Sequence, residues 1–366
     1  MKKRISALII LFVLCISLMC GCAKETVDYR TCLEAYIQTM DYHDGFTILQ
    51  LTDIHWNGAT QIGNAEYGSE EYLTKVINEA IEHTGGIDLI EVTGDTFMLA
   101  GPRAVRSFIS FMEELGIPYA MTWGNHDREG KYNPNWLSRQ FLNAEHCLYT
   151  EVDNDNVHER CNYCINLTDT AGQVCWQLIH LDSGASYREG AADMSLTYDY
   201  LRADQFEWMS AEHELAGASV PAICYYHIAQ LDNAAAWDAI EDGTLDCKHK
   251  FFNHEGFCNS AYATSTEAVF AANNVRAVFC GHAHSTDWTY TSLSGITYGL
   301  GVKTGKELYC TTTDMTTDEP GFELTEDFEL TGASLVTLND TEGGFTLEHL
   351  YLNERDEGDF VMWVEY

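Results

Sequence analysis

Five short polar motifs each follow an apolar run that predicts a buried strand. The runs are rich in β-branched and aromatic residues and cover residues 46–51, 87–92, 118–123, 222–226 and 277–280. The motifs that follow them are Asp53-Ile54-His55, Gly94-Asp95, Gly124-Asn125-His126-Asp127, His227 and Gly281-His282-Ala283-His284. Because ligands of an open α/β sheet gather beyond the carboxyl ends of its strands, this pattern predicts that the motifs converge on one crevice.

The motifs carry enough hard and borderline ligands for two metal ions. Asp53 and His55 are two residues apart, and alternation along an extended chain turns both side chains to the same side. The carboxylate of Asp95 has two oxygens and can bridge two cations. A mixed oxygen and nitrogen site of this kind fits iron, manganese or zinc better than calcium or a thiolate-bound metal.

The order and spacing of the motifs resemble the calcineurin-like metallophosphoesterase superfamily over roughly residues 45–310. The stretches 198–209, 275–287 and 295–305 are similar to its purple-acid-phosphatase-related, Icc-type branch. The resemblance implies a single-domain α/β fold, a four-layer αββα sandwich. It also implies a dinuclear metal site that hydrolyses phosphoesters.

The same resemblance implies a role for each motif residue. The first metal would be held by Asp53, His55, Asp95 and His284, and the second by Asp95, Asn125, His227 and His282. A hydroxide generated by the two ions would attack phosphorus in line, without a covalent enzyme intermediate. His126 follows Asn125 and is placed to protonate the leaving oxygen, with Asp127 holding its imidazole in orientation.

The chain departs from the family pattern in two respects. The family often has proline two residues after the histidine that matches His227, where this chain has Ala229. Purple acid phosphatases lack the first-motif histidine and have a tyrosine after the Gly-Asp motif, whereas this chain has His55 and Met98. We therefore expect no tyrosinate-to-iron charge-transfer colour.

The N-terminus has the pattern of an export signal. Met1-Lys2-Lys3-Arg4 precedes an apolar stretch over residues 5–20, which is typical of a secretory signal, although a bare transmembrane anchor is the alternative. Residues 19–22 resemble a bacterial lipobox, with Cys22 as the lipid attachment site. Either interpretation tethers the protein to a membrane outside the cytoplasm.

The expected organisation has four parts. Residues 1–22 form the signal, 23–44 a spacer with a helix over residues 33–39, 45–352 the catalytic domain and 353–366 a C-terminal tail. Within the catalytic domain, helical spacing covers residues 69–81, 102–115, 203–215 and 266–272. Strand-like runs between residues 147 and 183 predict a second sheet, and a strand pair over 333–338 and 345–352 is expected to complete it.

The net charge restricts the partners of the chain. A formal charge of −36 repels polyanions, and no basic stripe is visible, so the sequence argues against nucleic acid as a partner. The negative charge repels a small phosphate ester less than a polyanion, provided that bound cations reverse the sign of the local field. Metal ions are thus required electrostatically as well as chemically.

Cys161 and Cys164 form the one close cysteine pair beyond the signal region. A local disulfide or two unpaired thiols are both compatible with this spacing. A redox centre or a zinc site is disfavoured, because no second pair stands at ligand spacing.

The sequence favours an exported phosphatase or phosphodiesterase that acts on small phosphate esters. Within enzymes, the alternative is a nucleotidase or a phospholipid-headgroup phosphodiesterase. A different class is a non-catalytic surface binding protein on the same fold. The choice among esters depends on pocket walls, which we expect from loops over residues 57–68, 230–260 and 285–292.

Overall fold

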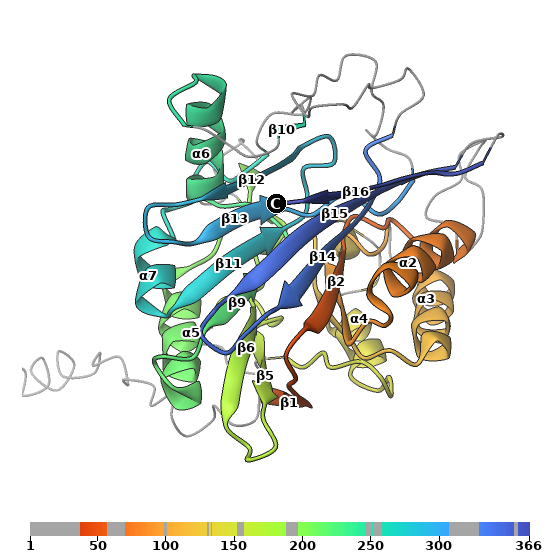
Figure 1. Cartoon of the computed structure of the whole chain (residues 1–366), viewed down its shortest axis with the longest axis horizontal. Coiled ribbons are helices and arrows are strands. Elements are labelled where there is room, and N and C mark those ends of the chain that lie inside the picture. The colour runs from red at the N-terminus through yellow and green to blue at the C-terminus, as the bar shows by residue number, and fades with distance from the viewer. Residues whose placement is uncertain are drawn as a thin grey trace, which may run out of the picture.

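Two stacked sheets form the centre of the molecule, with helices on both outer faces (Figure 1). This architecture is the predicted four-layer αββα sandwich. The computed structural model describes residues 37–56, 70–98, 101–129, 132, 134–151, 157–187, 197–245, 250–251, 258–306, 329–354 and 358–366.

The first sheet has six strands in the order β16-β15-β14-β2-β3-β4. These strands are β2 (Phe46–Leu51), β3 (Leu89–Thr93), β4 (Tyr119–Thr122), β14 (Gly332–Leu338), β15 (Phe345–Asn353) and β16 (Phe360–Glu365). Strands β2, β3 and β4 run parallel and are connected through α2 (Glu70–Thr84) and α3 (Pro102–Leu115). Together with α4 (Pro134–Phe141), these helices lie on the same outer side of the molecule (Figure 1).

The second sheet has eight strands in the order β1-β5-β6-β9-β11-β13-β12-β10. These strands are β1 (Ile37–Asp41), β5 (Tyr163–Thr168), β6 (Val174–His180), β9 (Ala222–Tyr225), β10 (Lys250–Phe251), β11 (Val275–Cys280), β12 (Asp287–Thr291) and β13 (Thr297–Leu300). Its outer face is covered by α5 (Ala203–Ala216), α6 (Leu231–Glu241) and α7 (Glu267–Ala272) (Figure 1). A separate two-stranded ribbon pairs β7 (Ser186–Tyr187) with β8 (Thr197–Tyr198).

The strands that carry the motifs are buried on both faces, as parallel strands of a layered fold require. Every residue of β2 and β3 is buried. Along β5, Ile165 belongs to the core cluster of the six-stranded sheet, while its neighbour Cys164 belongs to the cluster beneath α5 and α7. The alternating side chains of β5 therefore join the two cores of the sandwich.

Helix α3 shows how local sequence sets the element boundaries. It begins at Pro102, whose missing N–H is not needed in the first turn, and it ends before Gly116. Gly116 has φ of 64°, the left-handed conformation that suits a residue without a Cβ. Both boundaries match the sequence prediction.

Two expectations about the outer strands are wrong. The pair β14–β15 extends the first sheet and not the second, because β14 pairs antiparallel with β2 from Ser334 opposite Gln50 to Leu338 opposite Phe46. Part of the helix expected over residues 33–39 is instead strand β1, which pairs in parallel with β5. In both places the choice is made by a partner strand distant in the sequence, which overrides the weak local preference.

The end of the chain and the expected pocket loops also contain regular structure. In the tail predicted over residues 353–366, β16 pairs antiparallel with β15. Helix α6 lies in the segment 230–260 and β12 in the segment 285–292, both of which we expected as loops. The third expected loop, residues 57–68, lies outside the described residues.

Cys161 and Cys164 are two separate thiols, which decides between the alternatives left open by their spacing. They belong to different core clusters, so their side chains lie on opposite sides of the chain. The predicted signal, with Cys22, falls outside the described residues. Within the described ranges, no helix has the length and apolar character needed to cross a membrane.

Candidate metal centre

The five motifs come from two different sheets. Three follow β2, β3 and β4 of the six-stranded sheet, and two follow β9 and β11 of the eight-stranded sheet. Backbone hydrogen bonds connect neighbouring motifs, from Asp53 N–H to the carbonyl of Gly94 (3.1 Å) and from Gly281 N–H to the carbonyl of His227 (3.1 Å). One further bond joins the sheets, because the His282 N–H donates to Oδ2 of Asp53 (3.0 Å).

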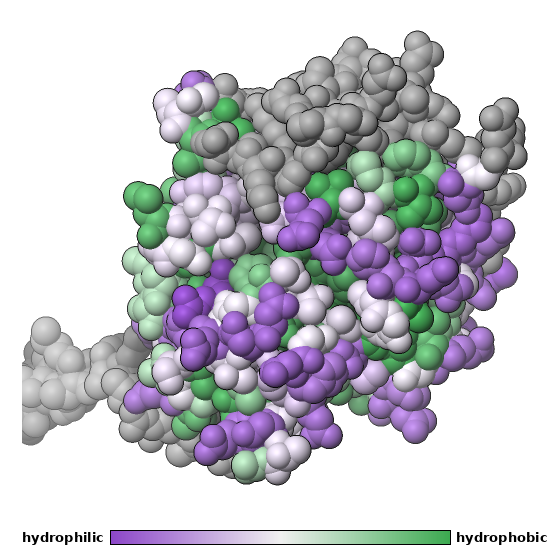
Figure 2. Space-filling view, in the orientation of Figure 1, coloured by the Kyte–Doolittle hydropathy of each residue, from purple (hydrophilic) through white to green (hydrophobic). Residues whose placement is uncertain are grey.

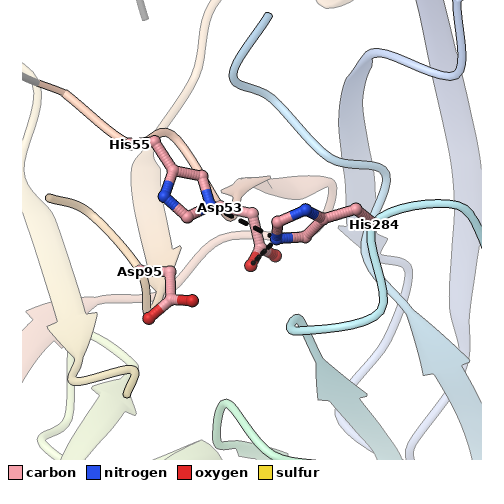
Figure 3. Close-up of side chains that lie close together, drawn as sticks. All are labelled: Asp53, His55, Asp95 and His284. Carbon is pink, nitrogen blue, oxygen red and sulfur yellow. Dashed lines mark hydrogen bonds and ion pairs between the residues drawn. The ribbon is translucent and has the colours of Figure 1, made fainter. Parts of the chain in front are cut away.

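The first group of possible ligands is Asp53, His55, Asp95 and His284. Each offers a ligand atom within 4.8 Å of the other three, and all four residues are buried. Figure 3 shows the four side chains pointing toward one another, with Nε2 of His284 3.1 Å from Oδ1 of Asp53 and 3.2 Å from Nε2 of His55. This is the set of residues predicted for the first metal.

The second group contains Asp95, His227 and His282, whose ligand atoms again lie within 4.8 Å of one another. Nε2 of His227 is 3.2 Å from Oδ2 of Asp95, and its Nδ1 donates to the carbonyl of Thr93 (2.9 Å). This hydrogen bond fixes the tautomer and leaves Nε2 facing the cluster. Asp95 is shared by both groups, as expected of a bridging carboxylate.

Oδ1 of Asn125 is buried without a hydrogen-bond partner among the described residues. A buried polar atom that is left unpaired costs free energy, so this oxygen is a candidate for contact to a bound cation. Oδ2 of Asp95 and Nε2 of His227 are buried as well and form an ion pair at 3.2 Å. The donor set therefore fits a metal ion, and it includes the predicted Asn125.

The backbone is strained at the predicted ligands. Asp53, His55, Asp95 and His282 all have positive φ, between 46° and 76°. A residue with a Cβ adopts this conformation at a cost of about 1–3 kcal/mol, which the surrounding structure has to offset. Such strain is concentrated at functional sites, and here it points the ligand side chains into one space.

Glycines precede the ligands because the side chains of neighbouring motifs pack directly against them. A Cβ at Gly94 would lie 2.4 Å from Nδ1 of His227, and Gly94 also has φ of +89°. A Cβ at Gly281 would lie 2.7 Å from Oδ2 of Asp53. The glycines of the motifs thus serve the close approach of ligands from the two sheets.

Oppositely charged side chains in the site shift one another's pKa. Burial raises the pKa of the Asp95 carboxyl, but His227 and His55 together lower it, so its net pKa lies below the usual range. Burial lowers the pKa of His227, but Asp95, Asp53 and the carbonyl of Thr93 together raise it to about 9. Because metal ligands bind in their deprotonated form, a cation entering this site displaces the proton of His227.

His126 lies at the edge of the centre, but Asp127 does not orient its ring as predicted. The Asp127 carboxylate is buried and accepts hydrogen bonds from the N–H groups of Phe97 and Gly124, both at 2.8 Å. It thereby ties together the loops that follow β3 and β4. The carboxylate beside the His126 ring is instead that of Glu129, with Oε2 2.7 Å from Nδ1.

Two cationic residues at the site were not predicted from the sequence. Lys303 is buried and donates from Nζ to the backbone carbonyl of Asp53 (2.9 Å). Arg128 bonds to Glu159 (2.7 Å) and to Asp182, which connects the end of the Asn125 motif to the end of β6. Lys303 lies in the stretch 295–305 that carries part of the family resemblance, so a signal for it was present.

A third group of possible ligands, His158, Glu159 and Asp199, is occupied by the protein itself. Arg128 pairs with Glu159, and Arg202 pairs with Asp199. Two guanidinium groups already neutralise these carboxylates, so this group is a salt-bridge network of the scaffold.

The family model for calcineurin-like phosphoesterases matches residues 46–286, which contain all the motifs. The chain belongs to the calcineurin-like phosphoesterase family. It is accordingly a metal-dependent phosphoester hydrolase, with a candidate site for two metal ions at the shared carboxylate Asp95.

Two relatives and a solved structure are similar to this chain. One relative, from Arabidopsis thaliana, is described as probable inactive purple acid phosphatase 28. It is 25% identical to this chain over 300 residues, which cover 72% of this chain and 71% of the relative's length. A probable cyclic nucleotide phosphodiesterase from Psychrobacter arcticus is 22% identical over 270 residues, covering 68% and 77%. The crystal structure of a dimetal phosphatase from Danio rerio has the same fold, with a TM-score of 0.52 at 12% identity, covering 88% of this chain and 100% of that one.

Proposed function

We propose that this family member hydrolyses small phosphate mono- or diesters at the two clusters that share Asp95. One ion would be held by Asp53, His55, Asp95 and His284, and the other by Asp95, Asn125, His227 and His282. The observation that carries the proposal is that the buried Asp95 is shared by two groups of closely spaced ligand atoms. Two bound ions would act as Lewis acids and would lower the pKa of a bound water to near neutral.

The protein's own contribution is to place a proton donor beside the ions. The His126 side chain is 28% exposed, whereas the predicted metal ligands other than His282 are buried, so His126 can meet a substrate oxygen. Its Nε2 lies 4.0 Å from Oδ2 of Asp95, on the side of the shared carboxylate. We assign His126 the protonation of the leaving oxygen.

Hydrolysis of chromogenic esters tests this function. The chain from Ala23 onward would be loaded with manganese and given p-nitrophenyl phosphate or the bis(p-nitrophenyl) diester, each with and without EDTA. Turnover that EDTA abolishes supports the proposal, and the faster substrate assigns a mono- or diesterase preference. No turnover of any ester by protein that contains two manganese ions would instead support a non-catalytic binding protein.

A cyclic nucleotide is the second candidate substrate, because the Psychrobacter arcticus relative is described as a probable cyclic nucleotide phosphodiesterase. Cleavage of cyclic AMP faster than of the bis(p-nitrophenyl) diester would favour it. Phospholipid headgroups are a further alternative if the chain is held at a membrane.

We propose that the protein is exported and lipid-anchored at Cys22, on the pattern of residues 1–22. Expression in a bacterial host with radiolabelled palmitate tests the anchor. Wild-type protein should carry label in the membrane fraction, and Cys22→Ser should carry none. Label on neither protein, with both retained in the membrane, would favour a bare transmembrane anchor.

A further inference from the structure

The carboxylate of Glu129 contacts the ring of His126 at the edge of the metal centre. Its Oε2 lies 2.7 Å from Nδ1 of His126. The carboxylate that the sequence predicted for this position, Asp127, is engaged with two backbone N–H groups instead. Among the residues that the structure describes, Glu129 therefore supplies the acidic side chain at hydrogen-bond distance from the His126 ring.

This contact determines which ring nitrogen faces the cluster. An ionised carboxylate can only accept, so Nδ1 of His126 carries the hydrogen and donates it to Glu129. The other nitrogen, Nε2, lies 4.0 Å from Oδ2 of Asp95, the carboxylate shared by the two ligand groups. The ring is thus turned with Nε2 toward the place where a substrate would be bound.

Local geometry explains why residue 129 and not residue 127 meets the ring. Residues His126–Arg128 form a single 3-10 turn, and the N–H of Glu129 donates to the carbonyl of His126 (3.2 Å). In a 3-10 turn the side chains at positions i and i+3 lie one above the other. Asp127, one position along, points away into the loops that follow β3 and β4.

We propose that Glu129 is a positioning residue that holds His126 in the orientation and tautomer needed to protonate the leaving group. The inference rests on the proposed function. As the bond from phosphorus to the leaving oxygen breaks, the Nε2 proton of the imidazolium passes to that oxygen. The ring becomes neutral and keeps its Nδ1 hydrogen on Glu129, and solvent returns the lost proton.

Stability alone does not account for this pair. The Glu129 side chain is 48% exposed and that of His126 is 28% exposed. An ion pair in such a place contributes about 0–1 kcal/mol to folding. Removing the Glu129 carboxylate should therefore leave the fold intact, which makes its effect on the reaction measurable.

Leaving groups of different basicity distinguish the loss of His126 positioning from a general loss of activity. p-Nitrophenolate leaves with little help from an acid, whereas phenolate requires protonation, so loss of the donor slows phenyl phosphate selectively. We expect Glu129→Ala in the manganese-loaded protein to lower kcat for phenyl phosphate by about ten-fold or more, and for p-nitrophenyl phosphate by less than about three-fold. If the wild type prefers diesters, the corresponding phenyl and p-nitrophenyl diesters take their place.

Three variants complete the design. Glu129→Gln keeps an oxygen that can accept from Nδ1 and should retain more activity on phenyl phosphate than Glu129→Ala. His126→Gln should show the largest selective loss. Glu114→Gln, at an exposed glutamate of α3, is the matched control and should behave as wild type on both esters. Manganese content, measured by elemental analysis, should be equal in all of them.

The outcomes distinguish this inference from the proposed function. Equal losses on both esters in Glu129→Ala, or no loss on either, would overturn the positioning role even if His126→Gln is selective. If the manganese-loaded wild type cleaves neither ester nor any diester, the proposed function fails and the inference falls with it.

Discussion

At the scale of single residues, the side chains and glycines of the centre are packed so closely that larger groups do not fit in their places. Asp95 accepts a hydrogen bond at Oδ1 from the His126 N–H (2.8 Å) and presents Oδ2 to His227. A Cβ on Gly124 would meet Oδ1 of Asp95 at 2.1 Å. Small changes at these positions should therefore affect metal binding before they affect the fold.

Asp95 and His126 should differ in what their substitution removes. Asp95→Asn replaces the shared carboxylate by a neutral amide, so we expect loss of bound metal and of most activity. His126→Gln should keep both metals and slow turnover of substrates with poor leaving groups by about 10²–10⁴-fold. Elemental analysis combined with kcat would decide, and equal metal loss in the two variants would reject this division of roles.

Gly94 offers a test of close packing at the centre. Gly94→Ala would place a Cβ 2.4 Å from the His227 ring, so we expect weaker metal binding and lower activity. Gly85→Ala is the matched control, because Gly85 has a similar φ of +86° and nothing within 4 Å of the added atom. Both variants should lose about 1–2 kcal/mol of unfolding free energy from the left-handed backbone. Unchanged manganese affinity in Gly94→Ala, measured by calorimetry, would contradict the packing argument.

At the scale of elements, strands bring the ligands to their places and helices close the outer layers of the sandwich. Helix α5 carries a buried acid, Glu212, on the side that faces the second sheet. Burial raises the pKa of Glu212 to about 8, with Trp208 partly offsetting the shift. The folded chain therefore holds this proton over a pH range in which the unfolded chain has released it.

This buried acid predicts a pH dependence of stability with a definite sign. Below the ordinary pKa of glutamate both states are protonated and Glu212 has no effect. As the pH rises from about 4.5 to about 8, the unfolded state ionises first, so the free energy of unfolding should fall by a few kcal/mol. Glu212→Gln should show a smaller fall in urea denaturation between pH 5 and pH 8. Glu207→Gln, at an exposed position on α5, should show the same pH dependence of unfolding free energy as the wild type. If all three proteins show the same pH dependence, Glu212 is not its origin.

At the scale of the whole molecule, the centre joins the two sheets. Besides the bond from His282 to Asp53, the backbone N–H of Thr304 donates to the carbonyl of Thr52 (2.8 Å). In addition, Oδ2 of Asp287 on β12 lies 3.0 Å from Nδ1 of His349 on β15, which links the sheets again. Figure 2 shows hydrophilic residues interspersed with small hydrophobic areas on the described part of one face.

Because ligands from both sheets would bind the ions, metal binding should stabilise the entire fold. Free manganese at 100 times its dissociation constant would add about 2.7 kcal/mol to the free energy of unfolding. We expect Tm to fall by several degrees in EDTA and to rise with manganese concentration. Asp95→Asn should have a Tm that manganese hardly changes. A wild-type Tm that is the same in EDTA and in manganese would show that the centre does not hold the ions.

The sequence by itself determined the local elements and which residues are candidate ligands. Apolar runs predicted β2, β3, β4, β9 and β11 within a few residues, and the helix boundaries at Pro102 and Gly116 followed from backbone chemistry. The candidate ligands could be named because their motifs follow strands and resemble the family pattern. These features are encoded by neighbours in the chain, which periodicity and motif spacing report.

Only the tertiary structure decided which strands are partners and which carboxylate faces which donor. The pair β14–β15 joined β2 across nearly the whole chain, and Lys303 reached the carbonyl of Asp53. Glu129 rather than Asp127 met His126, because a single 3-10 turn placed position i+3 beside the ring. Strand partners are selected by packing and hydrogen bonds between segments distant in the sequence, and the backbone path of a short turn decides where its side chains point. Neither can be obtained from the spacing of residues alone.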